Sequence, residues 1–286
     1  MINDTIVMEY SKHLISNDTQ YEKDKIHLFD TCFYLKLIQS QQQQQQRQHD
    51  NTRQSSSSKN IYSDWDKHID IFTKDFLIIP ICLDHHWLLV IVNFIGKIPP
   101  PPQSSSSSSP INITTTTDNH EIKNNYRYND DNDKNHNDND DNNDNHENIN
   151  NNTNKKDKTA CIFIFDSLKS YEDDSPEDAG KLTWPIREFL NNRWQQQQQQ
   201  QYNNEQQSER NFSDKSLMPE YIAKVPLQKN SFDCGIHLLC TLEKFLKQPL
   251  DIYHQVRNNC SLKTWPFHTT RKRNEIKKLL KKTIEN

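Results

Sequence analysis

FLIIPICLDHHWLLVIVNF, residues 76–94, contains two apolar runs that are separated by the polar residues Asp84–His86. Short runs rich in β-branched residues predict strands, so this stretch indicates two strands joined by a tight connection. Further along the chain, CIFIF at residues 161–165 predicts a third, fully apolar strand that ends at Asp166. These three strands are the predicted centre of the fold.

Helices are predicted on both sides of these strands in the sequence. Residues 5–16 place apolar residues at helical spacing after Asn3-Asp4, which can cap a helix start. Residues 25–38 indicate an extended aromatic segment that runs into a short helix, and WPIREFL at 184–190 indicates another helix. An amphipathic helix is predicted to begin near Cys234, because apolar residues recur at helical spacing after it. These residues are Leu239, Leu242, Phe245 and Leu246.

Three polar tracts separate segments of ordinary globular composition. Only 32% of the 286 residues are hydrophobic, which is too few for one globule of that length. We therefore expect disordered loop insertions at about 39–59, 97–157 and 195–215, where Gln, Ser, Pro, Asn and Asp dominate. The segments between the tracts are each too short to bury a core of their own. The sequence thus predicts a single domain over residues 1–286.

Charge and cysteine usage narrow the function classes. The formal net charge is -4, which gives no electrostatic reason to expect a nucleic-acid or membrane partner. Six scattered cysteines, without a CxxC pair or a zinc-ligand cluster, predict reduced thiols, no metal and no other cofactor. We expect a monomer in the nucleus, the cytoplasm or both, because no secretory signal or membrane-spanning run is present.

A basic cluster lies at Arg271–Lys282, near the end of the sequence. Its apolar residues recur at helical spacing, so we interpret it as a terminal helix with a solvated basic face. A role in nuclear import or in binding is the alternative. The histidines of the tract at 97–157 are expected to be incidental, and these are His120, His136 and His146.

Cys234 is the only cysteine predicted at a helix N-terminus. The free N–H groups and the macrodipole at that end favour a thiolate, which is the nucleophilic form of cysteine. Gly235 allows a substrate backbone to approach, and Gln228 has a side-chain amide that can donate to an oxyanion. Taken alone, Cys234 would more often be a buried structural cysteine. The combination of the three residues favours a nucleophile.

A cysteine nucleophile needs a base and a group that orients the base. His86 begins one predicted strand and Asp166 ends another, so the imidazole and the carboxylate can meet if the strands are neighbours. Each residue taken alone would more often be a turn or capping residue. Two other histidines compete as the base, namely His85, which strand alternation points the other way, and His237, three residues after Cys234. We prefer His86.

Three motifs now support a family resemblance. FLIIPICLDHHWLLVIV resembles the F-x-x-x-P-x…HWxLxVI block of the ubiquitin-like-protein-specific (SUMO/sentrin-specific, Ulp) cysteine proteases. IFIFDSL resembles their strand ending in Asp-Ser, and VPLQKNSFDCGIHLL resembles their P-x-Q-x-N-x-x-D-C-G nucleophile block. The order His, Asp, Gln, Cys is also that of the family. The resemblance implies an α/β (α+β) fold with a papain-like core, in which helices flank a central mixed sheet.

The resemblance also implies a chemistry and partners. Cys234, His86 and Asp166 would form the catalytic triad, with Gln228 in the oxyanion hole and Trp87 as the lid of a narrow tunnel. The tunnel would admit the C-terminal Gly-Gly of SUMO, so that SUMO and SUMO-conjugated proteins are the expected partners. The insertions look most like those of the members that dismantle poly-SUMO chains.

Two departures from the family pattern accompany the resemblance. Met1-Ile2 stands where the family has an aromatic residue before L-N-D, so a second aromatic wall of the tunnel is missing. His237 replaces an apolar or aromatic residue. Three alternatives stay open: a protease for another modifier such as Nedd8 or ubiquitin, a non-catalytic modifier-binding module, and a scaffold organised by the polar tracts.

Overall fold

A five-stranded mixed sheet, in the order β1-β2-β3-β4-β5, is the centre of the computed structural model, which describes residues 2–49, 68–98, 158–168, 176–201 and 210–284. Strands β2, β3 and β4 pair antiparallel, whereas β1 and β5 pair parallel at the two edges. The mixed sheet that the resemblance implied is confirmed. The strands are β1 (Ile26–Leu28), β2 (Phe76–Leu83), β3 (His86–Asn93), β4 (Cys161–Phe165) and β5 (Glu220–Ile222).

The β2–β3 hairpin sets the position of His86. Leu83 pairs with His86, so the connection consists of Asp84 and His85 alone, with φ angles of 47° and 64°. Two left-handed residues in a two-residue loop match the twist of the flanking strands. Asp and His enter this region more readily than most residues. The hairpin therefore places His86 at the first position of β3.

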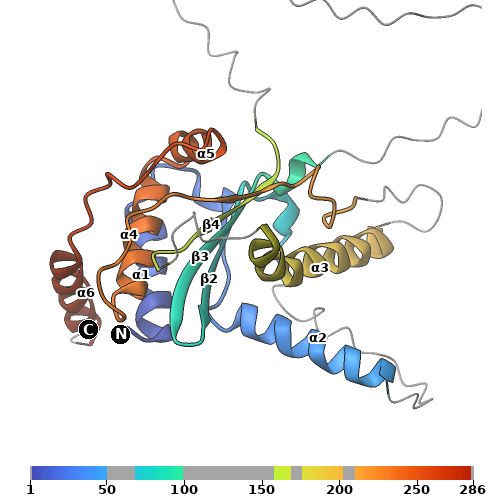
Figure 1. The fold of residues 1–286 in the computed structure, drawn as a ribbon, viewed down its shortest axis with the longest axis horizontal. Coiled ribbons are helices and arrows are strands. Elements are labelled where there is room, and N and C mark those ends of the chain that lie inside the picture. Colours follow the sequence, from blue (N-terminus) through green and yellow to red (C-terminus); the bar gives the residue numbers. More distant parts are fainter. Residues whose placement is uncertain (1, 50–67, 99–157, 169–175, 202–209, 285–286) are drawn as a thin grey trace, which may run out of the picture. The chain divides into compact units, whose positions relative to one another are not determined.

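Helices cover both faces of the sheet. Figure 1 shows α1, α4, α5 and α6 on one side of the strands and α2 and α3 on the other. Alternate residues of β3 serve the two faces: Trp87 joins the core below α1 and α4, and Leu88 joins the core below α2 and α3. Burial on both faces explains why these strands are continuous apolar runs. The helices are α1 (Asp4–Asn17), α2 (Phe33–His49), α3 (Pro176–Gln201), α4 (Cys234–Lys247), α5 (Pro249–Arg257) and α6 (Thr269–Ile284), with short 3₁₀ turns η1 (Lys23–Lys25), η2 (Ile71–Thr73) and η3 (Ile95–Lys97).

The starts of α1 and α4 follow the sequence prediction, whereas α3 begins at Pro176, before the predicted stretch at 184–190. The Asn3 side chain accepts a hydrogen bond from the Ile6 N–H at 3.0 Å, which confirms the predicted cap of α1. Helix α4 begins at Cys234, as its amphipathic pattern predicts. Strand β5 and helix α5 were not predicted, and they lie on either side of α4 in the sequence.

The predicted limits of two polar tracts are wrong. Helix α2 continues to His49 and α3 continues to Gln201, so residues 39–49 and 195–201 are helical. Gln is a good helix former, and an anchored helix extends into such a tract more easily than a new helix starts there. At the far end of the last tract, Phe212 is fully buried and its ring centroid lies 5.4 Å from that of Phe72.

The tract at 97–157 is described only at its first two residues. Lys97 ends η3, and Ile98 is buried. Residues 99–157, which include the three histidines expected to be incidental, lie outside the described residues. The described residues all belong to one unit made of Met1–Pro101 and Asp157–Asn286. The single-domain prediction for the whole chain stays a prediction.

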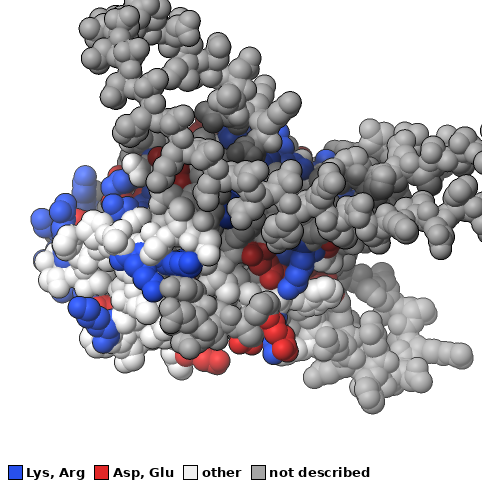
Figure 2. Space-filling view, turned by 45° about the horizontal axis from the view of Figure 1, so that its top comes forward, with Lys and Arg blue, Asp and Glu red and all other residues white. Residues whose placement is uncertain are grey.

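Helix α6 is less solvated than its sequence indicates. Lys272 is buried, and its ammonium donates to Glu275 at 2.7 Å, to Glu243 of α4 and to the Tyr10 hydroxyl at 3.3 Å. The prediction of a solvated basic face is therefore wrong at Lys272, because acidic residues of α4 and α6 neutralise it inside the fold. On the face in Figure 2, described Lys and Arg side chains form separate groups with uncharged surface between them.

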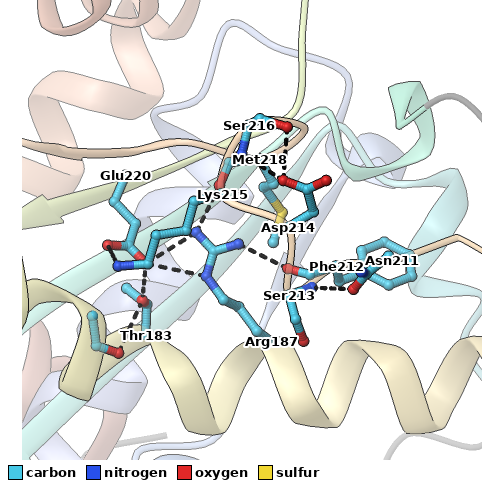
Figure 3. A network of polar contacts seen from close by, with 11 residues as sticks. Thr183, Arg187, Asn211, Phe212, Ser213, Asp214, Lys215, Ser216, Met218 and Glu220 are labelled. Atoms are coloured by element: carbon cyan, nitrogen blue, oxygen red, sulfur yellow. Dashed lines mark hydrogen bonds and ion pairs between the residues drawn. The ribbon is translucent and has the colours of Figure 1, made fainter.

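A buried ion pair joins α3 to β5 (Figure 3). Arg187 is 1% exposed, and its Nε donates to Glu220 at 3.1 Å. Its Nη1 and Nη2 donate to the carbonyl oxygens of Phe212 and Met218 at 2.8 and 2.6 Å. Glu220 also accepts from the Thr183 hydroxyl. One arginine therefore fixes the segment before β5 against α3.

Candidate active site

His86 and Asp166 form a direct pair at one edge of the sheet. Strands β3 and β4 are neighbours, with Leu89 opposite Phe165, so the start of β3 lies beside the end of β4. The His86 Nε2 lies 2.7 Å from the Asp166 Oδ1. The two side chains are 18% and 8% exposed. The structure thus brings together the two residues that the strand ends predicted.

The Asp166 carboxylate is held in place by its own backbone. Its Oδ1 accepts a second hydrogen bond, at 2.8 Å, from the N–H of Leu168, which is the local turn that Asp commonly forms. A carboxylate opposite Nε2 fixes the proton of a neutral imidazole on that nitrogen, so Nδ1 is the basic atom. His86 Nδ1 is buried and has no hydrogen-bond partner within the described ranges.

Cys234 stands at the first position of α4 and is 1% exposed. The next residue, Gly235, is closely surrounded. A methyl group on its Cα would lie 3.2 Å from Trp87 Cδ1 and 2.5 Å from Ile2 Cγ1. Cys234 is therefore next to a residue in contact with Trp87, the neighbour of His86. Since His86 Nδ1 has no described partner, no hydrogen bond yet joins it to Cys234. Such contacts commonly tighten only when substrate binds.

Trp87 lies between α4 and the N-terminal segment. It is 2% exposed, and its Nε1 donates to the Ile2 carbonyl at 3.2 Å. Ile2 thus holds the indole with its backbone and covers Gly235 with its side chain. The lid role of Trp87 stays a prediction, and Met1, the position of the missing aromatic wall, lies outside the described residues.

Gln228 is bound to the strand end that carries Asp166. Its backbone N–H donates to the Ser167 carbonyl at 2.8 Å, and its side-chain oxygen accepts from the Ser167 hydroxyl at 2.7 Å. The side-chain nitrogen donates to the Asn230 carbonyl at 2.5 Å. Gln228 therefore joins the Asp166 segment to the loop before Cys234, and its oxyanion role stays a prediction.

The two rival histidines occupy other surroundings. His85 is exposed in the hairpin turn. His237 is buried, its ring centroid lies 5.3 Å from that of Phe267, and it bonds the Pro226 backbone. Burial lowers the pKa of His237, although Pro226 and Asp233 favour its charged form. The geometry gives neither histidine the carboxylate contact that His86 has.

Three polar residues of the site were missed from the sequence. Ser167 binds Gln228, and Asn230 binds Asp233, the residue before the nucleophile. The spacing from Asn230 to Asp233 is typical of a local turn and could have been found. Arg273 binds the same carboxylate from 40 residues away, and no local pattern signals that contact.

The described parts of the chain offer two further findings on function class. None of their helices is both long and apolar enough to cross a membrane. Within the same parts, His, Cys, Asp and Glu side chains form no group of three or more that could hold a metal ion.

Known proteins are similar to this chain over nearly its whole length. Human (Homo sapiens) sentrin-specific protease 7 is 27% identical over 287 residues, which cover 98% of this chain and 25% of that protein. The Mus musculus protein of the same name is 25% identical over 285 residues, covering 98% and 26%. The chain thus spans about a quarter of the length of these curated relatives.

A solved structure supports the fold, and a family match supports the identity. The crystal structure of a de-sumoylating protease is 19% identical and superposes with a TM-score of 0.51, covering 90% of this chain and 66% of that one. The Ulp1 protease family, C-terminal catalytic domain, matches residues 1–284. A match over nearly the whole chain, together with a histidine–aspartate pair and a cysteine at a helix start, shows that this chain belongs to the Ulp1 family of cysteine peptidases.

Proposed function

We propose that this protein is a cysteine isopeptidase and endopeptidase that cleaves after the C-terminal Gly-Gly of a SUMO-type modifier. It would remove the modifier from target lysines or from poly-SUMO chains. The sentrin-specific and de-sumoylating names of its relatives support the choice of modifier. The observation that carries the catalytic assignment is the His86–Asp166 pair, whose arrangement leaves Nδ1 of the imidazole as a buried base without a described partner.

In the proposed reaction, the Cys234 thiolate attacks the carbonyl carbon of the terminal glycine. The oxyanion that forms accepts hydrogen bonds from backbone N–H groups at the start of α4 and from Gln228. The imidazolium of His86 gives its proton to the departing lysine amine, and Asp166 stabilises that imidazolium. His86 then activates the water that hydrolyses the thioester.

The contacts of Gln228 are compatible with this role. A primary amide has two N–H groups. One of them donates to the Asn230 carbonyl, and the proposal uses the other. The hydroxyl of Ser167 fixes the amide oxygen, so the plane of the amide is restrained. Restraint matters because a preorganised donor stabilises a developing charge without first reorganising.

The test is covalent capture by modifiers that carry a C-terminal electrophile. SUMO, Nedd8 and ubiquitin probes are each incubated with the protein and with Cys234→Ala, and adducts are separated on denaturing gels. An adduct with SUMO alone that Cys234→Ala lacks supports the proposal. A Cys234-dependent adduct with Nedd8 or ubiquitin alone would reassign the modifier, and no adduct with any probe would overturn the enzyme assignment.

The poly-SUMO preference needs a separate comparison. Cleavage rates of di-SUMO and of SUMO fused to an unrelated peptide are measured with the same preparation. Faster cleavage of di-SUMO supports chain editing, whereas equal rates leave a general SUMO isopeptidase.

A further inference from the structure

Asp233 stands directly before Cys234, at the N-cap position of α4, yet its side chain makes no capping hydrogen bond. An aspartate in this position ordinarily accepts a hydrogen bond from the second or third N–H of the helix. It also brings a full negative charge to the positive end of the helix dipole. Both effects would compete with a thiolate at the first position of the same helix.

The Asp233 carboxylate is instead engaged outside the helix. Its Oδ2 accepts from the Asn230 side-chain amide at 2.9 Å, and its Oδ1 pairs with the Arg273 guanidinium of α6. Asn230 in turn accepts from the backbone N–H groups of Phe232 and Asp233 at 3.1 and 2.9 Å. The loop before Cys234 is thus closed on itself, and both carboxylate oxygens are bound away from the first turn of α4.

Arg273 lies on α6, a helix that packs against α4. Ile276 of α6 is buried in the same core as α4, and Lys272 pairs with Glu243 of α4. The Arg273 guanidinium carbon also lies 5.9 Å from the centre of the Phe232 ring. The position of the arginine is therefore set by packing, and not by its pairing with Asp233 alone.

Titratable or charged groups interact with Cys234 or with its neighbour Asp233. Cys82 of β2 interacts with Cys234 and with Asp4 of α1, whereas Asp233 interacts with His237 of α4 and with Arg273 of α6. His86 of β3 is the proposed base. Burial raises the pKa of the Cys82 thiol, and Asp4 and Cys234 raise it further. Burial opposes ionisation of Asp233, but hydrogen bonds from Asn230 and Arg273 outweigh it and hold the pKa of that carboxyl below its usual value. Asp233 is therefore ionised at neutral pH.

We propose that Arg273 is a positioning residue for the nucleophile: it holds the Asp233 carboxylate away from the first turn of α4, so that the N–H groups of that turn serve the Cys234 thiolate and the oxyanion. This inference rests on the proposed function, because it takes Cys234 as the nucleophile. Without the guanidinium, only the Asn230 amide still holds the carboxylate, and the released Oδ1 can turn to the first N–H groups of α4. A carboxylate that close to a thiol raises the thiol pKa by about one unit or more.

The experiment follows the reactivity of Cys234 without any modifier. The rate of alkylation by iodoacetamide is measured against pH, and the Cys234 peptide is quantified by mass spectrometry. Arg273→Met is expected to move the midpoint of the profile upward by about one pH unit. Arg273→Lys keeps a point charge and is expected to move it by a smaller amount. Thermal melting checks that each variant is folded.

The decisive variant is Arg273→Met combined with Asp233→Asn. It removes both charges together, so the net charge near Cys234 equals that of the wild type, and the midpoint is expected to return to the wild-type value. Arg271→Met is the matched control, because Arg271 is an exposed arginine of the same helix that pairs with Glu275 at 2.9 Å. Its profile is expected to match that of the wild type.

Two results would overturn the inference: an unchanged midpoint in Arg273→Met, or a shift that Asp233→Asn does not reverse. If Arg273→Met does not fold, Arg273→Lys with and without Asp233→Asn is judged by the same two criteria. Failure of the proposed function is recognised separately, because it shows as the absence of a modifier adduct in the wild type. The alkylation profiles of the variants do not depend on that adduct.

Discussion

Two buried ion pairs lie near opposite ends of β4, and they differ in how fully their atoms are bonded. Arg187 uses all three guanidinium nitrogens, toward Glu220 and two backbone carbonyls, near the first residues of β4. At the other end of the strand, His86 uses one ring nitrogen toward Asp166, and its second nitrogen has no partner among the described residues.

This difference is what we expect if the Arg187 pair is structural and the His86–Asp166 pair is catalytic, as proposed. A buried polar atom without a partner costs about 1–3 kcal/mol, so folds rarely retain one without a use. The proposed function gives such a use, as a base, to the Nδ1 of His86, which has no partner among the described residues. All three nitrogens of the Arg187 guanidinium are instead bonded inside the fold, and their effect is to fix β5 and the segment before it. The predictions below test whether activity and stability divide in this way.

The largest expected effect is on activity, in Asp166→Asn. Asparagine carries no negative charge, so it does not stabilise the imidazolium of His86 as the Asp166 carboxylate does. By analogy with other triads, kcat/KM should fall by about 10³–10⁴-fold. The measurement is release of a fluorophore from the SUMO C-terminus, with denaturant unfolding as the control for folding. The catalytic role of the His86–Asp166 pair is contradicted if Asp166→Asn keeps more than about a tenth of wild-type kcat/KM.

The next largest effect is on stability, in Arg187→Met. Removing Arg187 leaves the buried Glu220 with the exposed Lys215 as its remaining cation, and the free energy of unfolding should fall by about 3 kcal/mol. Urea unfolding gives this value, and kcat/KM is measured on protein that remains folded. Because the network lies away from Asp166, kcat/KM should stay within about threefold of wild type.

A matched double variant sharpens this second prediction. Arg187→Met combined with Glu220→Met removes both charges, and replacement of a whole buried pair by apolar residues is far less destabilising than loss of one member. The double variant should therefore unfold at a higher urea concentration than Arg187→Met. A large loss of activity in either variant without loss of stability would assign the network to the chemistry.

The sequence made the chemical pair easier to predict than the structural one. His86 begins one apolar run and Asp166 follows another, so local pattern places them, and β3–β4 pairing brings them together. Arg187 sits inside a helical pattern, where nothing local indicates that it turns inward to Glu220. Strand β5 is three half-buried residues without an apolar run, so period-based prediction has no signal there. The contact of Arg273 with Asp233 is equally non-local.

Composition also misplaced the ends of the polar tracts. It indicates where a chain has too little apolar surface to form a core, but not how far a neighbouring helix continues. Residues 39–49 and 195–201 are helical because α2 and α3 are already nucleated and anchored to the sheet. Phe212 was assigned to a tract although it is fully buried. A single aromatic residue among polar neighbours was too weak a signal.

A smaller effect is expected from the Lys272 cluster, in which the Lys272 ammonium donates to Glu243, Glu275 and the Tyr10 hydroxyl. Hydrogen bonds from Lys272 lower the pKa of Glu275, and for Glu243 those from Lys247 and Lys272 outweigh burial, which acts in the opposite direction. A carboxyl whose folded pKa is lowered stabilises the fold above its unfolded pKa of about 4.3, and this contribution is lost as pH falls through the folded value. The melting temperature should therefore drop below about pH 5.

In Lys272→Met the melting temperature should fall less steeply as the pH is lowered, because the two carboxyl groups lose the partner that lowers their pKa. Melting curves from about pH 3 to 7 measure the slope. Lys277→Met is the control, since Lys277 is an exposed lysine of the same helix. If the melting temperature falls with pH as steeply in Lys272→Met as in Lys277→Met, other carboxylates dominate acid unfolding.

The smallest expected effect comes from His85, the histidine next to the proposed catalytic pair. His85 is exposed and has a φ of 64°, a conformation that strains side chains with a Cβ. His85→Gly removes this strain but adds chain entropy to the unfolded state, so the free energy of unfolding should rise by about 0.5–1 kcal/mol. Since His85 lacks the carboxylate contact of His86, kcat/KM should stay within about twofold. A more than tenfold loss with the fold intact would make His85 the base, and His86 would then be the structural member of the pair.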